Sequence, residues 1–267
     1  MYSQILVPLD GSDRALAAVG PARRLATLHG ARLRLVTVAT PDTRAEELEA
    51  IVVSGREVVA ASEPDVTILR GDDPAAELAR LDREDPQALL CLTTRARRPL
   101  GRMLFGSVAG ELLRQSHKAT ALIGPSCDVA DTTAIRRLVV CLDGTPAGET
   151  IVPWATRWSV ATGVPLVLVR VVYPLVEAAA RIPPTEEQLD DLGYVRRLAL
   201  RLEQAGHRVA DVTVQHASAS DALVDLAADI PGALLAVSTA AAEPLEGSTA
   251  AQLVRSSSVP VLVASRA

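Results

Sequence analysis

Short runs of apolar residues alternate along this chain with longer stretches in which apolar residues recur at helical spacing. The short runs are typical of buried strands, and the longer spacing is typical of helices with one buried face. In the first half the expected strands are residues 5–9, 33–39, 66–69, 89–92 and 121–123. The expected helices begin at Ser12, Glu46, Asp73 and Ser107. Continuous apolar strands separated by helices predict an α/β fold whose parallel sheet is covered on both faces.

Local signals predict several helix ends. Ser12 is expected to cap a helix that Gly30 terminates, and Asp73 is expected to cap a helix that has proline at its first position. In the second half, Thr185 and Gln188 have the spacing of a capping box. These signals place helices between the expected strands of both halves.

The pattern occurs twice. Residues 5–12 read ILVPLDGS and residues 138–145 read LVVCLDGT, and a Gly-Ser pair stands near the end of each half. Asp10 and Asp143 are 133 residues apart, as are Val38 and Val171. Further along, the offset changes only between expected elements, where loops tolerate insertions. We therefore predict two tandem domains, residues 1–128 and 133–267.

Composition narrows the class of protein. A hydrophobic content of 49% is enough for two cores, and a net charge of -5 argues against nucleic-acid binding. Cys91 and Cys141 lie in apolar strand runs, so we expect buried, reduced thiols. No basic and apolar leader precedes Ile5, and no apolar run could span a bilayer. We expect a cytoplasmic protein that does not insert into a membrane.

Three motifs follow one another in the first half. An apolar strand ends at Asp10-Gly-Ser, a Gly71-Asp72 turn precedes a helix, and a strand, a loop and Gly106-Ser107 precede another helix. In this order they resemble the universal stress protein family, over nearly the whole chain as a tandem pair. The resemblance implies a doubly wound, Rossmann-like sheet with strand order 3-2-1-4-5 in each domain. It also implies ATP binding where strands 1 and 4 diverge, the usual ligand position in open α/β sheets.

The resemblance assigns roles to residues of the first half. Asp10 would accept hydrogen bonds from the nucleoside, with Pro8 and Leu9 forming the wall beside it. Val38 would contact the adenine, and Gly71 would allow the backbone to approach the ribose. Three of these residues also have a purely structural explanation: Asp10 as a charge at a helix start, Val38 as a core valine and Gly71 as a turn glycine.

The expected phosphate end is Gly106-Ser107, at a helix start where free N–H groups and the helix dipole favour anions. Nucleotide-binding members have Gly-x-x-Gly before this point, and here those glycines are replaced by Thr93 and Ala96. Residues with a Cβ reach positive φ less easily, so this loop departs from the family pattern. Four arginines crowd the loop: Arg95, Arg97, Arg98 and Arg102. They could replace backbone donors by charge-assisted contacts, or form a solvated basic loop.

The second half carries a candidate second site, whose matching residues are Asp143, Val171, Gly247 and Ser248. Its loop before Gly247 is four residues shorter than the first, and Ala217 replaces the turn glycine. Glu243 and Glu246 put negative charge where phosphate would lie. We expect this site to be weak or empty, with Asp143 and Ser248 retained for structural reasons.

Enzymatic signatures are missing from the sequence. We find no nucleotide phosphate loop, no dinucleotide fingerprint and no nucleophile elbow, and therefore expect no catalytic residue. The four histidines lack the spacing of metal ligands, so we expect no protein metal site; His29 is expected to have a surface capping role.

Two functions remain. One is a stress-response regulator that binds ATP, ADP or AMP, with or without magnesium, mainly in the first domain and acts on a protein partner. The other is a nucleotide-independent dimeric scaffold of the same fold. Single-domain relatives commonly dimerise through their last strands, so residues 120–123 and 260–263 are expected to pair inside this chain as a pseudo-dimer. The whole chain could in addition form a homodimer.

Overall fold

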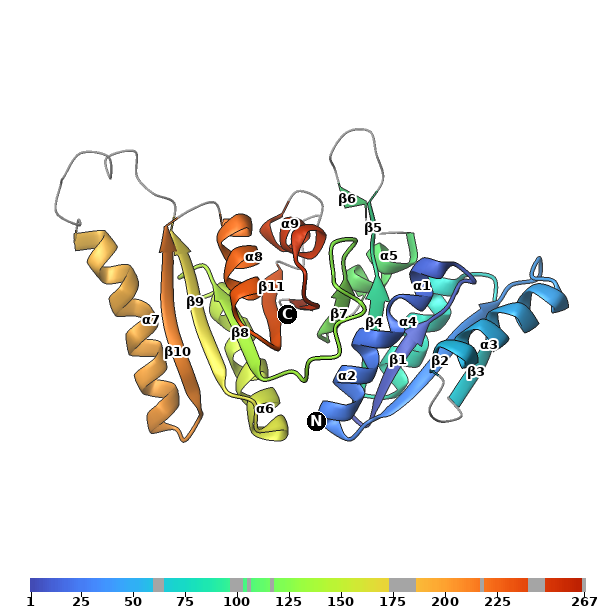
Figure 1. Ribbon diagram of the computed structural model, residues 1–267, viewed down its shortest axis with the longest axis horizontal. Coiled ribbons are helices and arrows are strands. Elements are labelled where there is room, and N and C mark those ends of the chain that lie inside the picture. Colours follow the sequence, from blue (N-terminus) through green and yellow to red (C-terminus); the bar gives the residue numbers. More distant parts are fainter. Residues whose placement is uncertain are drawn as a thin grey trace.

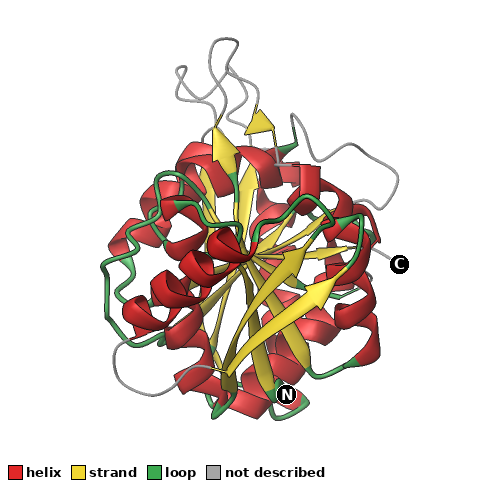
Figure 2. Cartoon of the chain, turned by 90° about the vertical axis from the view of Figure 1, so that its right-hand side faces the viewer, coloured by secondary structure: helices red, strands yellow, loops and turns green. Residues whose placement is uncertain are grey.

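The computed structural model describes residues 1–59, 65–96, 103–104, 107–115, 118–172, 186–216, 219–239 and 248–265. Ten of the described strands form one continuous sheet. Helices cover both faces of this twisted sheet, as the end-on view in Figure 2 shows.

The first half supplies five parallel strands to the sheet: β1 (Gln4–Pro8), β2 (Arg32–Ala39), β3 (Asp65–Arg70), β4 (Ala88–Thr93) and β7 (Thr120–Ile123). Its helices are α1 (Asp13–Leu16), α2 (Val19–His29), α3 (Ala45–Val59), α4 (Pro74–Glu84) and α5 (Ser107–Gln115). The strand order β3-β2-β1-β4-β7 is the predicted 3-2-1-4-5 (Figure 1).

The second half repeats this arrangement with β8 (Arg137–Leu142), β9 (Leu166–Val172), β10 (Val209–His216), β11 (Ala233–Thr239) and β12 (Val261–Ser265). A 3-10 turn, η1 (Gly148–Ile151), leads into α6 (Val152–Thr162), and the later helices are α7 (Glu186–Gln204), α8 (Ala219–Asp229) and α9 (Thr249–Ser256). Its order is β10-β9-β8-β11-β12, so the predicted α/β fold with two doubly wound parallel units is confirmed.

Several expected helix ends are observed. The Ser12 side chain accepts a hydrogen bond from the Ala15 N–H at 3.2 Å, and Asp73 caps α4 in the same manner. Gly30 ends α2 in the left-handed conformation, at φ 60°. Thr185 lies outside the described residues, although α7 begins directly after it.

The helix expected from Ser12 to Gly30 is divided into α1 and α2, which contradicts the single helix predicted. Pro21 explains the break, because it has no N–H to donate to the carbonyl of residue 17 and its ring would clash with that carbonyl in a continuous helix. In α2, Pro21 lies in the first turn, where no helical N–H bond is required. Helical periodicity alone did not reveal this break.

The two halves meet through their last strands. β12 pairs antiparallel with β7, with Val261 opposite Leu122 and Val263 opposite Thr120. The predicted pairing of these strands within one chain is confirmed. Each face of the joined sheet carries a hydrophobic cluster that contains residues of both halves, under α1, α2, α3, α6 and α7 on one face and α4, α5, α8 and α9 on the other.

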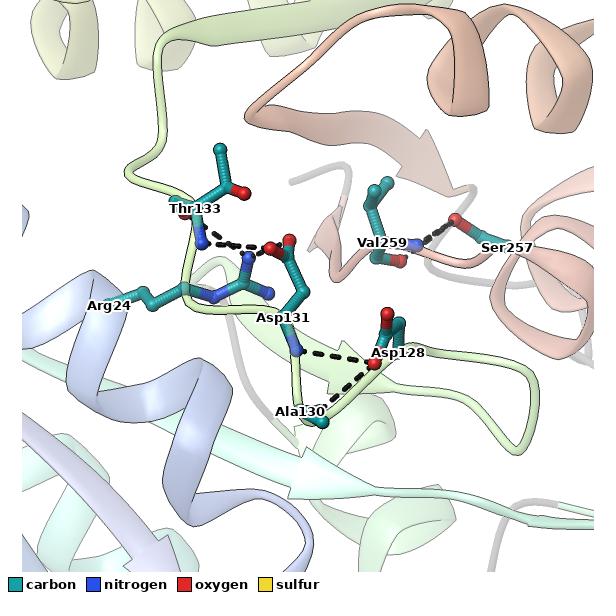
Figure 3. Close-up of polar contacts among 7 residues, drawn as sticks. All are labelled: Arg24, Asp128, Ala130, Asp131, Thr133, Ser257 and Val259. Atoms are coloured by element: carbon teal, nitrogen blue, oxygen red, sulfur yellow. Dashed lines mark hydrogen bonds and ion pairs between the residues drawn. The ribbon is translucent and has the colours of Figure 1, made fainter.

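The segment between the halves is held on both sides. Arg24 of α2 donates from Nη1 to Asp131 Oδ2 at 2.5 Å and to the Thr133 carbonyl at 3.4 Å (Figure 3). Asp128 donates its N–H to the Ser258 carbonyl at 2.8 Å, next to β12. The segment that connects the two halves is therefore bound to both of them.

Aromatic side chains gather where α2 meets α6. Trp154 Nε1 donates to the Tyr2 hydroxyl at 3.1 Å, and the His29 ring lies 5.0 Å from Tyr2 and 5.5 Å from Trp158, edge to face in both cases. The surface role expected for His29 is therefore wrong, because packing of the second half against α2 covers it. Burial, with the N-terminal ammonium adding to it, lowers the pKa of His29 to about 4.

All three cysteines are buried and unpaired, as expected for Cys91 and Cys141. Burial raises the pKa of Cys127 to about 11 and that of Cys141 to about 12. Thiols that remain protonated at neutral pH are weak nucleophiles, so these side chains have packing roles.

Trp158→Ala should destabilise the protein strongly. Trp158 is 0% exposed at the contact between the halves, so its removal leaves a large cavity and should lower the free energy of unfolding by about 3–5 kcal/mol. Val160→Ala is a matched control on the same helix, because Val160 is 69% exposed and its truncation should change stability by less than about 0.5 kcal/mol. Urea unfolding measures both, and equal effects would contradict the buried junction.

Acid should destabilise the protein through His29. The folded state keeps this imidazole neutral down to about pH 4, whereas the unfolded chain takes up a proton near the ordinary pKa of 6.5. The unfolded state therefore binds more protons in this window, and the free energy of unfolding should fall as pH drops from 6.5 to about 4. Urea unfolding of the wild type and His29→Gln at several pH values tests this. The variant should lose less stability on acidification, and an unchanged pH dependence would contradict the assignment.

Candidate functional site

A cavity of about 270 Å³ opens at the carboxyl ends of β1, β2 and β4. At this point β2 and β4 lie on opposite sides of β1. The connections that follow β1 and β4 therefore leave in opposite directions, which opens a crevice at the carboxyl ends of the strands. Its wall includes the strand residues Pro8, Thr37, Val38 and Thr93, together with Leu9 and Asp10 directly after β1. Five residues predicted for the first site therefore line one cavity, namely Pro8, Leu9, Asp10, Val38 and Thr93.

The Asp-Gly-Ser motif forms a compact turn at the mouth of this cavity. Asp10 Oδ1 accepts hydrogen bonds from the Ser12 N–H at 3.1 Å and from the Ser12 hydroxyl at 2.5 Å. Gly11 lies between them at φ 80°, a conformation that favours glycine. The turn fixes the Asp10 carboxylate at the end of β1 and leads the chain into α1.

The same turn occurs in the second half. Asp143 Oδ1 accepts from the Thr145 N–H at 2.9 Å and from the Thr145 hydroxyl at 2.7 Å. Ser248 caps α9 by accepting from the Ala251 N–H at 3.1 Å. The retained residues of the second half therefore have structural roles in the turn and the cap. Val171 lies on β9, and Gly247 is outside the described residues.

Gly71 does not line the cavity. Its N–H donates to the Ala39 carbonyl at 3.2 Å, and a Cβ placed on it would lie 2.6 Å from Glu77 Cγ. The missing side chain thus makes room for Glu77, on α4. The structure provides this local explanation for the glycine that the resemblance assigned to the ribose.

The loop after β4 contains a short hairpin that sequence reasoning missed. β5 (Arg95–Ala96) pairs antiparallel with β6 (Met103–Leu104), so Ala96 lies opposite Met103. An extended strand suits residues with a Cβ, whereas the family glycines allow a turn of positive φ. Arg97 and Gly106 lie outside the described residues, and Ser107 is the first residue of α5.

Two charged residues that the sequence did not single out line the cavity. Arg14 of α1 donates from Nη1 to the Thr94 carbonyl at 3.1 Å, which ties the first helical turn to the end of β4. Glu47 lies on the wall formed by α3. The position of Arg14, two residues after the Ser12 cap, was the available signal, but its use required knowing that α1 folds over β4.

The cavity combines apolar walls with a few polar groups at its mouth. Val36, Val38 and Leu92 supply apolar surface, while Asp10 offers a hydrogen-bond acceptor and Arg14 a cation. This arrangement suits a flat ring with hydroxyl groups and a nearby negative charge. No group of three or more His, Cys, Asp or Glu side chains that could hold a metal occurs within the part of the chain that the structure describes.

Comparison with known families agrees with this geometry. The model of the universal stress protein family matches residues 1–123 and again residues 134–265. The chain belongs to the universal stress protein family. The two matches correspond to the two five-strand units of the sheet.

Solved structures show the same fold over the whole chain. A universal stress protein from Archaeoglobus fulgidus DSM 4304 is 18% identical, with both chains covered completely and a TM-score of 0.69. A putative universal stress protein from Pseudomonas aeruginosa UCBPP-PA14 is 15% identical, covering 99% of this chain and 93% of its own, with a TM-score of 0.61. A search of curated proteins found no match. Among the helices in the described residues, none is both long and apolar enough to cross a membrane.

Gly11→Ala should cost more stability than Gly30→Ala. Both glycines have positive φ, so alanine at either position is strained by about 1–2 kcal/mol. At Gly30 a Cβ meets nothing within 4 Å, whereas at Gly11 it would lie 3.1 Å from Ile51 Cγ1 and push on the cavity wall. Thermal or urea unfolding compares the two variants, and a larger loss for Gly30→Ala would contradict the geometry of the turn.

Proposed function

We propose that the first half of this universal stress protein binds an adenine nucleotide (ATP, ADP or AMP, with or without magnesium) as a regulatory ligand in a stress response. The observation that carries the proposal is the cavity at the switch in strand order, with Asp10 and Arg14 at its mouth. Ligands of open α/β sheets bind at this position.

The residues present fit the nucleoside portion of such a ligand. The cavity volume of about 270 Å³ is near the lower end of small-molecule pockets, which suits a nucleoside better than a larger ligand. Its apolar walls would contact the base, and Asp10 would accept hydrogen bonds from sugar hydroxyls. Arg14 would supply positive charge to the phosphates, together with the start of α5.

We propose a binding function without a catalytic one. The cavity residues include carboxylates, hydroxyls and a guanidinium, but His29 lies in the aromatic contact between the halves and the three thiols are buried. A nucleotide held here would act by changing the surface offered to a protein partner.

Asp10→Ala should weaken nucleotide binding by about 10-fold or more, because it removes an acceptor for the sugar. Asp143→Ala is a matched control, since it removes the same turn from the second half and should leave the dissociation constant nearly unchanged. Ser107→Ala and Ser248→Ala form a second such pair. Isothermal titration with ATP, ADP and AMP, with and without magnesium, measures all four. Equal effects of Asp10→Ala and Asp143→Ala would contradict a site in the first half.

The second candidate function is a nucleotide-independent dimeric scaffold. It is favoured by the β5–β6 hairpin, which stands where nucleotide-binding members have a glycine loop. In that case the wild type would show no saturable binding of any adenine nucleotide, and the same titrations separate the two functions.

A further inference from the structure

One strand position differs in a way that bears directly on the two sites. Val36 of β2 lies opposite Pro8, and Val169 of β9 lies opposite Cys141, the residue equivalent to Pro8. The next residue along is Thr37 in the first half and Arg170 in the second. The two units therefore place a small hydroxyl and a long cation at the same point of the same strand.

In the first half this position carries a short side chain at the cavity wall. Thr37 is 3% exposed and forms part of the cavity wall. The nearest atom to a Cβ placed on Gly11 is Ile51 Cγ1 of α3, an apolar side chain 3.1 Å away. The region over the Asp-Gly turn is thus bounded by apolar atoms, beside an open cavity.

In the second half the guanidinium of Arg170 lies over the equivalent glycine. A Cβ placed on Gly144 would overlap Nη1 and Cζ of Arg170. Gly144 has φ 78° and no side chain, which leaves the room that the guanidinium takes. Arg170 therefore lies directly against the turn that holds Asp143.

Neighbouring groups hold the cation in this place. Arg170 Cζ lies 5.3 Å from the centre of the Tyr194 ring, within the range of a cation–π contact. Glu149 pairs with Arg201 at 3.4 Å on the adjoining surface. Burial raises the pKa of Tyr194 to about 12, with Glu149 and Asp143 contributing in the same direction and Arg170 opposing them. The carboxylates of Asp143 and Glu149, the ring of Tyr194 and the guanidinium of Arg170 thus lie close together at the Asp-Gly turn of the second half.

We propose that Arg170 is a specificity-determining residue, whose guanidinium occupies in the second half the space that the nucleoside occupies in the first. It would close the second site from within, so that each chain holds one nucleotide. This inference rests on the proposed function of the first half. It explains the closed second site by a cause that is separate from the shortened second loop.

Exchange of the two residues tests the inference in both directions. Arg170→Thr should open the second site, so that the number of adenosine molecules bound per chain rises from one to two. Adenosine is the suitable probe because it carries no phosphate for the acidic second loop to repel. Thr37→Arg should close the first site and weaken AMP binding by about 10-fold or more. Arg196→Thr, which removes an exposed arginine of α7, is the matched control and should leave both measurements unchanged.

Each outcome has a definite meaning. If the wild type binds one AMP per chain and folded Arg170→Thr still binds one adenosine, the inference is wrong while the proposed function stands. If Thr37→Arg fails to fold, Arg170→Thr alone decides. Should the wild type bind no adenine compound, the proposed function fails.

Crystal structures of the wild type and Arg170→Thr then decide whether the side chain closes a cavity. The inference requires the guanidinium over Gly144 in the wild type and an open cavity there in the variant. An Arg170 side chain directed into solvent, or a variant without the cavity, would overturn it.

Discussion

The antiparallel pairing of β7 with β12 makes one sheet out of two repeated units. Each of these strands would otherwise be an exposed edge, with unpaired N–H and carbonyl groups available to other chains. Their pairing also brings α2 against α6, which creates the buried contact of Tyr2, His29, Trp154 and Trp158. The Arg24–Asp131 ion pair then fixes the connecting segment at the same junction. The relative position of the halves is thus set by hydrogen bonds, aromatic packing and a charge pair together.

Duplication preserved what folding needs and allowed the rest to diverge. The Asp-Gly-Ser/Thr turn occurs in both halves with nearly the same hydrogen bonds, because a strand that leads into a helix at this angle needs its N–H groups satisfied. The aspartate of this motif is therefore explained by folding, whether or not a ligand is bound. Residues that shape the space above the turn, such as Thr37 and Arg170, have no such requirement. These positions distinguish the two sites more sharply than the motif does.

Local patterns were sufficient to predict the strands and the helix caps at Ser12 and Asp73. The order of the strands was predicted from the family resemblance. Local patterns failed where the outcome depends on packing or on a single residue within a pattern. Pro21 divided an otherwise periodic helix, and His29 was covered by a helix more than a hundred residues away in sequence. The cavity residues found from sequence lie on or next to the motifs. Arg14 and Arg170 were missed because their roles depend on which element each long side chain reaches.

The joined sheet also constrains how a ligand in the first half could act. Rotation of one half against the other would break the β7–β12 pairing and separate the aromatic side chains at the α2–α6 contact. A ligand can shift the equilibrium between two conformations only by the difference in its binding free energy for them. Because rotation of the halves would break so many contacts, that difference would have to be large. A change confined to the elements around the cavity mouth, such as α1, would leave the strand pairing and the aromatic packing intact. If a nucleotide regulates this protein, the signal is expected to leave through that surface, on the side of the sheet where the strands end.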